Sequence, residues 1–190
     1  RAMREDPADQ AKIPHPRLGF FGVIDERMDL ELLALVADAR PDWHIVMVGP
    51  TAKVDPSTLP SRDNIHWLGA KKYDELPAYC AGWDVALMPF ALNDSTRFIS
   101  PTKTLEYLAA GKPVVSTPIR DVVRPYGERG LVRIAERHEF VDEIEGALAE
   151  TSSARRAAAD AFLARTSWDH TFRRMSALLR ETARAKGQDA

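Results

Sequence analysis

Short, wholly apolar runs alternate along this chain with longer segments in which apolar residues recur at helical spacing. Continuous apolar runs indicate strands buried on both faces, and an i, i+3, i+4 spacing indicates amphipathic helices. The pattern predicts strands at 19–24, 43–48, 64–68, 84–88, 113–116 and 130–134. It predicts helices at 29–39, 74–80, 100–110, 136–149, 151–164 and 168–185.

The alternation of strands and helices predicts the fold class. Parallel strands need crossover connections, and right-handed crossovers place helices on both faces of a sheet. We therefore expect an α/β protein, a Rossmann-like three-layer sandwich with about six parallel strands. In such sheets small molecules bind beyond the carboxyl ends of the strands, where the strand order reverses.

Composition narrows the possible partners of this domain. The 190 residues include 26 basic and 28 acidic side chains, a net charge of −2, and 45% are hydrophobic. A chain so close to neutral is not expected to bind nucleic acid. The single cysteine excludes an internal disulfide, and the scattered histidines lack ligand spacing, so we expect no metal and no cofactor. These features are typical of a cytoplasmic protein.

The two ends of the chain differ from its middle. Residues 1–16 are charged and proline-bearing, which favours a linker or the edge of a larger chain, and residues 17–190 form the expected single domain. The last 40 residues carry eight basic and four acidic side chains. An exposed helical face explains this excess of basic residues, and contact with an acidic membrane surface or a partner domain is the alternative explanation.

The segment Ser100–Glu106 carries the clearest chemistry. Serine is a favoured N-cap and proline is favoured at the first helical position, so Ser100 is the expected cap. Free amides at Thr102 and Lys103 would then face an anion. Lys103 opposes the helix dipole by up to about 1 kcal/mol, a conflict that a bound diphosphate would remove.

Glu106 lies one turn beyond Thr102, on the same helix face. A carboxylate about 6 Å further along the axis can accept hydrogen bonds from both hydroxyls of a ribose. The pattern thus favours a nucleotide site, and the alternative is a capped helix on which Lys103 and Glu106 form a solvated pair.

The segment 101–115, PTKTLEYLAAGKPVV, resembles the signature of the C-terminal, donor-binding domain of retaining GT-B glycosyltransferases. This large group includes sucrose-phosphate synthases and bacterial polysaccharide and lipid glycosyltransferases. Four further segments and the sequence Ser-Trp-Asp that opens the last expected helix follow in the matching order, so the resemblance covers about residues 17–182.

The resemblance implies roles for individual residues. Glu106 would hold the donor ribose, and Lys103 with the amides around Thr102 would hold the diphosphate. It also implies a phosphate-approaching turn at Gly22, Arg27 as a phosphate ligand, and the base-reading segment Gly69-Ala70 with the neighbouring Leu76. The sequence itself adds Arg97, on a loop between a strand end and a helix start, and the hydroxyl of Ser100 at the expected helix start.

Two positions depart from the family pattern. The first glutamate of the family's pair would fall at Phe98, so Arg97, Asp94 or Thr96 is left to contact the sugar or phosphate end. The basic pair that usually follows the first-strand glycine is reduced to Arg27.

The resemblance implies a hexosyl transfer from a nucleotide sugar, with UDP the expected nucleotide, to a hydroxyl of a glycan or lipid-linked acceptor. An N-terminal acceptor domain is the implied partner, so this piece should bind nucleotide and transfer little sugar. A nucleotide-sugar epimerase of GT-B fold and a non-catalytic, flavodoxin-like binding module are the alternatives. The sequence lacks the G-x-G-x-x-G run of NAD-binding domains.

Overall fold

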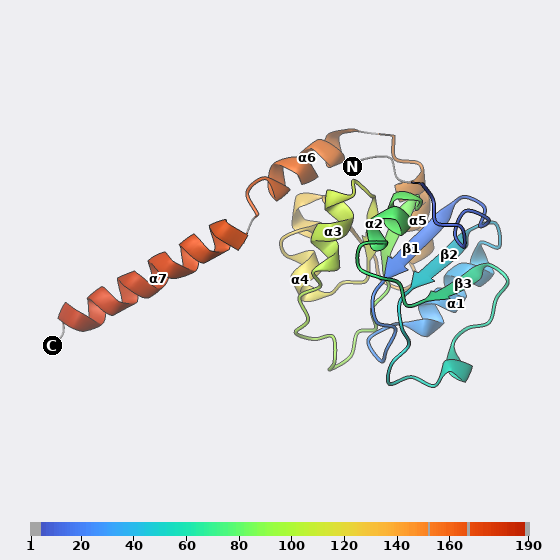
Figure 1. The fold of residues 1–190 in the computed structure, drawn as a ribbon, viewed down its shortest axis with the longest axis horizontal. Helices are drawn as coiled ribbons and strands as arrows, with labels where there is room; N and C mark the ends of the chain where they lie inside the picture. The colour runs from blue at the N-terminus through green and yellow to red at the C-terminus, as the bar shows by residue number, and fades with distance from the viewer. Residues whose placement is uncertain (1–4, 152, 167, 189–190) are drawn as a thin grey trace.

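The computed structural model describes residues 5–151, 153–166 and 168–188. Six strands and seven α-helices, with two short 3₁₀ turns, are found in these ranges (Figure 1). The strands are β1 (Arg17–Phe21), β2 (His44–Val48), β3 (Ile65–Gly69), β4 (Val85–Met88), β5 (Val114–Ser116) and β6 (Arg133–Ile134). The helices are α1 (Leu30–Ala39), α2 (Leu76–Ala81), α3 (Lys103–Ala109), α4 (Arg120–Val123), α5 (Phe140–Leu148), α6 (Ser153–Leu163) and α7 (Trp168–Gln188), and the 3₁₀ turns are η1 (Pro56–Thr58) and η2 (Gly127–Arg129).

The strands form one parallel sheet in the order β3-β2-β1-β4-β5-β6. Helices α1 and α5 pack on each other and on the sheet, whereas α2 contacts β1 and α3 contacts β5. Right-handed crossovers place α1 and α3 on opposite faces, because the chain moves in opposite directions after β1 and after β4. The expected three-layer sandwich is confirmed, and its strand order reverses between β1 and β4.

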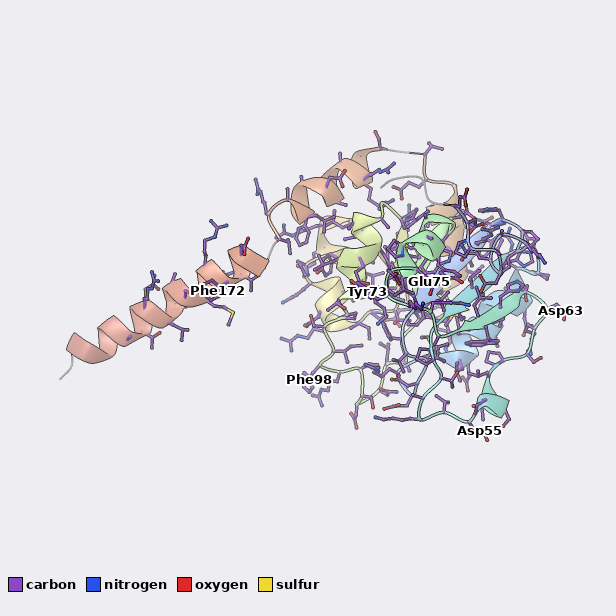
Figure 2. The ribbon with its side chains drawn as sticks, in the orientation of Figure 1. Asp55, Asp63, Tyr73, Glu75, Phe98 and Phe172 are labelled. Atoms are coloured by element: carbon purple, nitrogen blue, oxygen red, sulfur yellow. The ribbon has the colours of Figure 1, made fainter. Side chains whose placement is uncertain are left out.

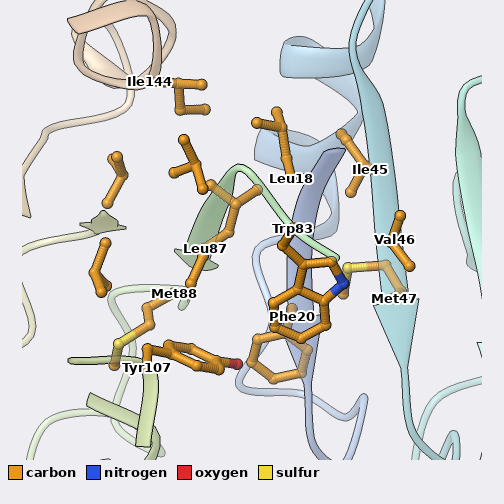
Figure 3. Packing of buried hydrophobic residues seen from close by; sticks show 14 of the residues in the cluster. Leu18, Phe20, Ile45, Val46, Met47, Trp83, Leu87, Met88, Tyr107 and Ile144 are labelled. Carbon is orange, nitrogen blue, oxygen red and sulfur yellow. The ribbon is translucent and has the colours of Figure 1, made fainter. Parts of the chain in front are cut away.

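The core on the α3 face fixes that helix to the end of β1. Trp83, Phe20 and Tyr107 are among the largest fully buried side chains and lie together beside β1 (Figure 3). The Tyr107 hydroxyl accepts a hydrogen bond from the backbone N–H of Phe21 at 3.0 Å. A buried hydrogen bond of this kind resists displacement, so α3 has a defined position at the carboxyl end of β1.

Residues 5–16, expected to be a linker, pack against the domain. The indole N–H of Trp83 donates to Gln10 Oε1 at 2.9 Å, and Gln10 Nε2 donates to the carbonyl of Tyr79 at 3.0 Å. Arg17 Nε donates to the carbonyl of Ile13 at 2.7 Å, and Ile13 itself is buried. Charge and proline content mark this segment as irregular, but they do not reveal that it covers the core.

The start of α3 corrects one local expectation. The helix begins at Lys103, and Thr102 occupies the N-cap position without a side-chain cap. Ser100 is therefore not the N-cap, and Pro101 precedes the helix; the amide of Thr104 donates to the Pro101 carbonyl at 3.3 Å in an initial turn. The short α4, η1 and η2 were not expected, because three or four residues are too few to show a helical period.

The last helix, α7, extends away from the three-layer body (Figure 1). Its side chains Phe172, Met175, Leu178 and Leu179 are all more than half exposed, and Phe172 is labelled in Figure 2. None of the helices in the described ranges combines the length and apolar character needed to cross a membrane.

Candidate functional site

Two glycines bring the ends of β1 and β2 into close contact. Gly22 follows β1 with φ +145°, and its amide donates to the carbonyl of Val48 at 2.8 Å. A Cβ placed on Gly49, at φ +148°, would overlap the carbonyl oxygen of Gly22. Only residues without a side chain permit this backbone geometry and this close approach, so both positions require glycine.

The side chain of Lys103 lies directly over Gly22. A Cβ on Gly22 would lie 2.8 Å from Lys103 Nζ, and the ammonium is 5.6 Å from the centroid of the Phe20 ring. Burial lowers the pKa of Lys103, an effect that the nearby charges of Glu106 and Asp25 oppose. No hydrogen bond or ion pair of this ammonium is found within the described ranges, so it is a half-buried cation that lacks a direct acceptor.

Lys112, just beyond α3, shows what a structural lysine looks like in the same domain. Its Nζ donates to the carbonyls of Ala81 at 2.7 Å and Trp83 at 2.5 Å. Burial lowers its pKa as well. Lys112 thus connects the end of α3 to the segment between α2 and β4. Lys103 is half-buried like Lys112 but has no such acceptors within the described residues.

Glu106 lies one turn from Lys103 and is half-buried. Its charge raises the pKa of Lys103 and contributes to raising that of Cys80 in α2. The carboxylate therefore lies within electrostatic range of both α2 and Lys103, and it forms no ion pair in the part of the chain that the structure describes. A hydrogen-bond acceptor, Glu106, and a cation, Lys103, therefore lie near each other at the end of the sheet where the strand order reverses.

The other cation expected here, Arg27, already has a partner. Its Nε donates to Asp25 Oδ1 at 2.9 Å, and its Nη2 donates to Oδ2 at 2.5 Å. The hydrogen bonds from Arg27 lower the pKa of Asp25. A phosphate at this position would have to compete with Asp25, a neighbour whose pairing the sequence did not predict.

The base-reading segment expected at Gly69-Ala70 follows β3 and is exposed. Gly69 has φ +68° and its carbonyl accepts a hydrogen bond from the amide of Gly49 at 2.9 Å, while the space around its Cβ position is open. Leu76 begins α2 and packs partly on the core. Two strand spacings, about 10 Å, separate β3 from β1.

The remaining expected residues lie on the loop between β4 and α3. Ser100 and Thr102 are exposed. Arg97 is also exposed, with its guanidinium carbon 5.2 Å from the Phe98 ring centroid. Phe98 is 73% exposed and projects from this loop (Figure 2). The structure thus brings Lys103 over Gly22, with Glu106 one turn along the same helix. The other expected residues lie after β1, after β3, at the start of α2 and on the β4–α3 loop.

Sequence comparison identifies relatives of this chain. Residues 15–150 match the family model described as glycosyl transferases group 1. Over 103 residues the chain is 36% identical to the putative teichuronic acid biosynthesis glycosyltransferase TuaH of Bacillus subtilis (strain 168). The match covers 53% of this chain and 26% of TuaH, so the chain spans about a quarter of that relative.

Solved structures share the fold at low sequence identity. HepE of Anabaena, solved with UDP and glucose, aligns with a TM-score of 0.65 and 16% identity over 94% of this chain and 53% of HepE. The sucrose-phosphate synthase of Thermosynechococcus elongatus gives 0.63 and 18% identity, covering 93% of this chain and 49% of that protein. The trehalose 6-phosphate synthase of Burkholderia multivorans gives 0.63 and 16%, covering 90% and 44%.

The family match covers residues 15–150, which include the six strands of the sheet, the glycine turn, Lys103 and Glu106. The expected resemblance to GT-B glycosyltransferases is confirmed by the family match and by the shared fold. The chain belongs to the group 1 glycosyl transferases.

Proposed function

We propose that this domain binds the nucleoside diphosphate of a nucleotide-sugar donor, with UDP as the nucleotide. The observation that carries the proposal is the Lys103 ammonium, which is half-buried over Gly22 and without a described acceptor. A diphosphate would supply that acceptor, and the glycine turn would let its oxygens approach the backbone.

In this arrangement Glu106 would bind the ribose of the nucleotide. A carboxylate accepts hydrogen bonds from both hydroxyls of a ribose, and Glu106 has no ion pair in the described ranges to give up. Gly69-Ala70 would contact the base, because the segment ends β3 and the space at the Gly69 Cβ position is open. Leu76, at the start of α2, would pack beside it. Arg27 would reach the phosphates only after exchanging part of its contact with Asp25.

In a longer protein we propose that the site supports hexosyl transfer to a glycan or lipid-linked hydroxyl, with retention at the anomeric carbon. Negative charge develops on the departing diphosphate, and a preorganised cation stabilises it by several kcal/mol. Lys103 is the residue placed to do so. The TuaH relative is named for biosynthesis of teichuronic acid, a polysaccharide product that supports a glycan acceptor.

We propose further that acceptor binding requires a second domain. The solved structures named above extend to roughly twice the matched length, and the apolar side chains on α7 remain exposed in this chain. Apolar rows of this kind usually mark a contact surface. The 190-residue chain should therefore bind donor nucleotide without measurable sugar transfer.

Calorimetric titration tests the nucleotide proposal directly. UDP, GDP, ADP and NAD are titrated into the chain and into its Lys103→Ala and Glu106→Ala variants. We expect selective binding of UDP that both substitutions weaken by at least about tenfold, the loss of one charge-assisted interaction. Failure of all four nucleotides to bind would overturn the proposal, as would variants that bind UDP unchanged.

A further inference from the structure

A pocket at the carboxyl edge of the sheet is lined by two arginines that form no ion pair within the described residues. It lies between the β4–α3 loop and the start of α4 and has a volume of about 350 Å³. Neither Arg97 nor Arg120 forms an ion pair with any carboxylate in residues 5–151, 153–166 or 168–188. The residues that line the pocket include Asn93, Asp94, Thr96, Arg97, Pro118 and Arg120.

About half of the arginines that the structure describes form ion pairs. Eight arginines form ion pairs with aspartate or glutamate side chains: Arg17, Arg27, Arg40, Arg62, Arg124, Arg133, Arg137 and Arg155. Within the described residues, Arg97 and Arg120 have no ion pair and line one pocket at the carboxyl ends of β4 and β5, the edge of the sheet that also carries the proposed nucleotide site. An anion supplied from outside can pair with both guanidinium groups there.

The loop that carries Arg97 is fixed by its own hydrogen bonds. The Thr96 side chain is buried, and its hydroxyl accepts from the amide of Asn93 at 3.0 Å and donates to the carbonyl of Ala91. The amide of Thr96 donates in return to Asn93 Oδ1 at 3.1 Å, and Asn93 Nδ2 donates to the Glu26 carbonyl at 3.1 Å. This closed turn presents Arg97 from a defined backbone position.

The two sides of the pocket are also tied to each other. The Thr117 hydroxyl donates to the carbonyl of Phe90 at 2.8 Å and accepts from the Phe90 amide at 3.2 Å. Thr117 precedes Arg120 by three residues, and the intervening Ile119 is buried. The backbone separation between the two arginines is therefore set by the fold, and a bound anion has to order only their side chains.

We propose that Arg97 and Arg120 form an anion subsite that takes the carboxylate of an acidic donor sugar, a nucleoside-diphosphate uronic acid. The inference rests on the proposed nucleotide site, because the sugar must start from the diphosphate at Lys103. β4 is hydrogen-bonded to both β1 and β5, and neighbouring strands lie about 4.8 Å apart. A sugar attached to a diphosphate over β1 can thus extend across β4 to this pocket.

The charges around the pocket favour a carboxylate over a neutral hydroxyl. Asp94 lines the same pocket, so two guanidinium groups face one carboxylate and a net positive charge remains. Phe98, next to Arg97, is apolar and exerts no repulsion on an acidic sugar. Guanidinium groups match carboxylates with paired, directional hydrogen bonds, which a neutral hexose cannot offer.

The test compares UDP-glucuronate with UDP-glucose, and with UDP alone, in calorimetric titrations of the 190-residue chain. We expect UDP-glucuronate to bind at least about tenfold more tightly than UDP-glucose, the effect of one charge-assisted contact. In Arg97→Gln and Arg120→Gln chains this ratio should fall at least about threefold, and in the double variant it should approach one. Arg129→Gln is the matched control: Arg129 is exposed, lies at the opposite end of the sheet and has no described ion pair, so the ratio should not change.

Each contrary outcome has a separate meaning. Equal affinities for the two sugars, with UDP binding still dependent on Lys103, would overturn the acidic-sugar subsite and leave the nucleotide site intact. Absence of UDP binding would overturn both. A titration with inorganic phosphate completes the test: binding that depends on Arg97 and Arg120 without any preference between the donors would overturn the proposal in favour of a phosphate on the acceptor.

Discussion

Replacing Lys103 by methionine tests whether its burial serves ligand binding or folding. Methionine keeps most of the volume of lysine and removes its charge. Lys103 has no described hydrogen bond or ion pair to lose, and burial already lowers its pKa. The substitution should therefore leave the melting temperature unchanged or raise it by up to about 4 °C, the value of about 1 kcal/mol in a domain of this size.

The matched variant is Lys112→Met, at a lysine with similar burial and the same direction of pKa shift. Its Nζ donates to two backbone carbonyls, at 2.7 and 2.5 Å. Loss of these charge-assisted bonds should cost about 2 kcal/mol, which lowers the melting temperature by roughly 4–8 °C. Lys103→Met removes the proposed contact to the diphosphate, about 1.5–3 kcal/mol, so the dissociation constant of UDP should rise roughly 10- to 150-fold.

Thermal unfolding followed by circular dichroism and calorimetric titration with UDP together separate the two roles. We expect Lys103→Met to weaken UDP binding without lowering the melting temperature. We expect Lys112→Met to lower the melting temperature but to bind UDP with normal affinity at temperatures where it is folded. If Lys103→Met destabilised the domain as strongly as Lys112→Met, or bound UDP with unchanged affinity, the argument from its missing acceptor would be refuted.

Four further outcomes are expected. Because the pKa of Lys103 is lowered, UDP affinity should decline with rising pH before the ordinary lysine value of 10.5 is reached, measured by titration between pH 7 and 10; affinity constant over that range would contradict a role for its charge. Gly22→Ala should destabilise the domain by more than about 1 kcal/mol and weaken UDP binding, because residue 22 has a positive φ and the added Cβ would meet Lys103. Gly130 also has a positive φ but lies in open space, so Gly130→Ala should leave UDP affinity unchanged. Gln10→Ala should cost about 1–3 kcal/mol in urea unfolding, because it removes the acceptor of the buried Trp83 indole; an unchanged midpoint would show that the segment contributes nothing. Burial raises the pKa of the Cys80 thiol to about 12, so iodoacetamide at pH 8 should label Cys80 only after unfolding. Stability should fall as pH rises above about 9, because the thiol then ionises in the unfolded chain but not in the folded one.

Much of the candidate site could be predicted from local sequence. Lys103 and Glu106 are three residues apart, so any helix through them places both side chains on one face. Gly22 follows an apolar run that ends in a turn, and the parallel sheet brings every such strand end to one edge. These conclusions need only helical periodicity and topology, and the structure confirms the topology.

Other parts of the site depend on contacts that no local pattern reports. The ring of hydrogen bonds among Asn93, Thr96 and Ala91 sets the course of the loop before α3, and the helix starts at Lys103 rather than at the favourable cap Ser100. Cap propensities of about 1 kcal/mol are small enough for such loop contacts to override. Arg120 could not be singled out, because it shares a pocket with Arg97 only after two separate loops are joined through Thr117.

The sequence by itself determined the number of strands, the fold class and the helix face that carries Lys103 and Glu106, because each depends on residues near one another in the chain. Tertiary structure alone decided that residues 5–16 pack on Trp83, that Arg27 is paired with Asp25, and that Lys103 lies over Gly22 without an acceptor. The physical reason is that burial and charge pairing depend on which side chains meet across the fold. Amino-acid preference describes a residue's own backbone, not the neighbours that folding brings to it.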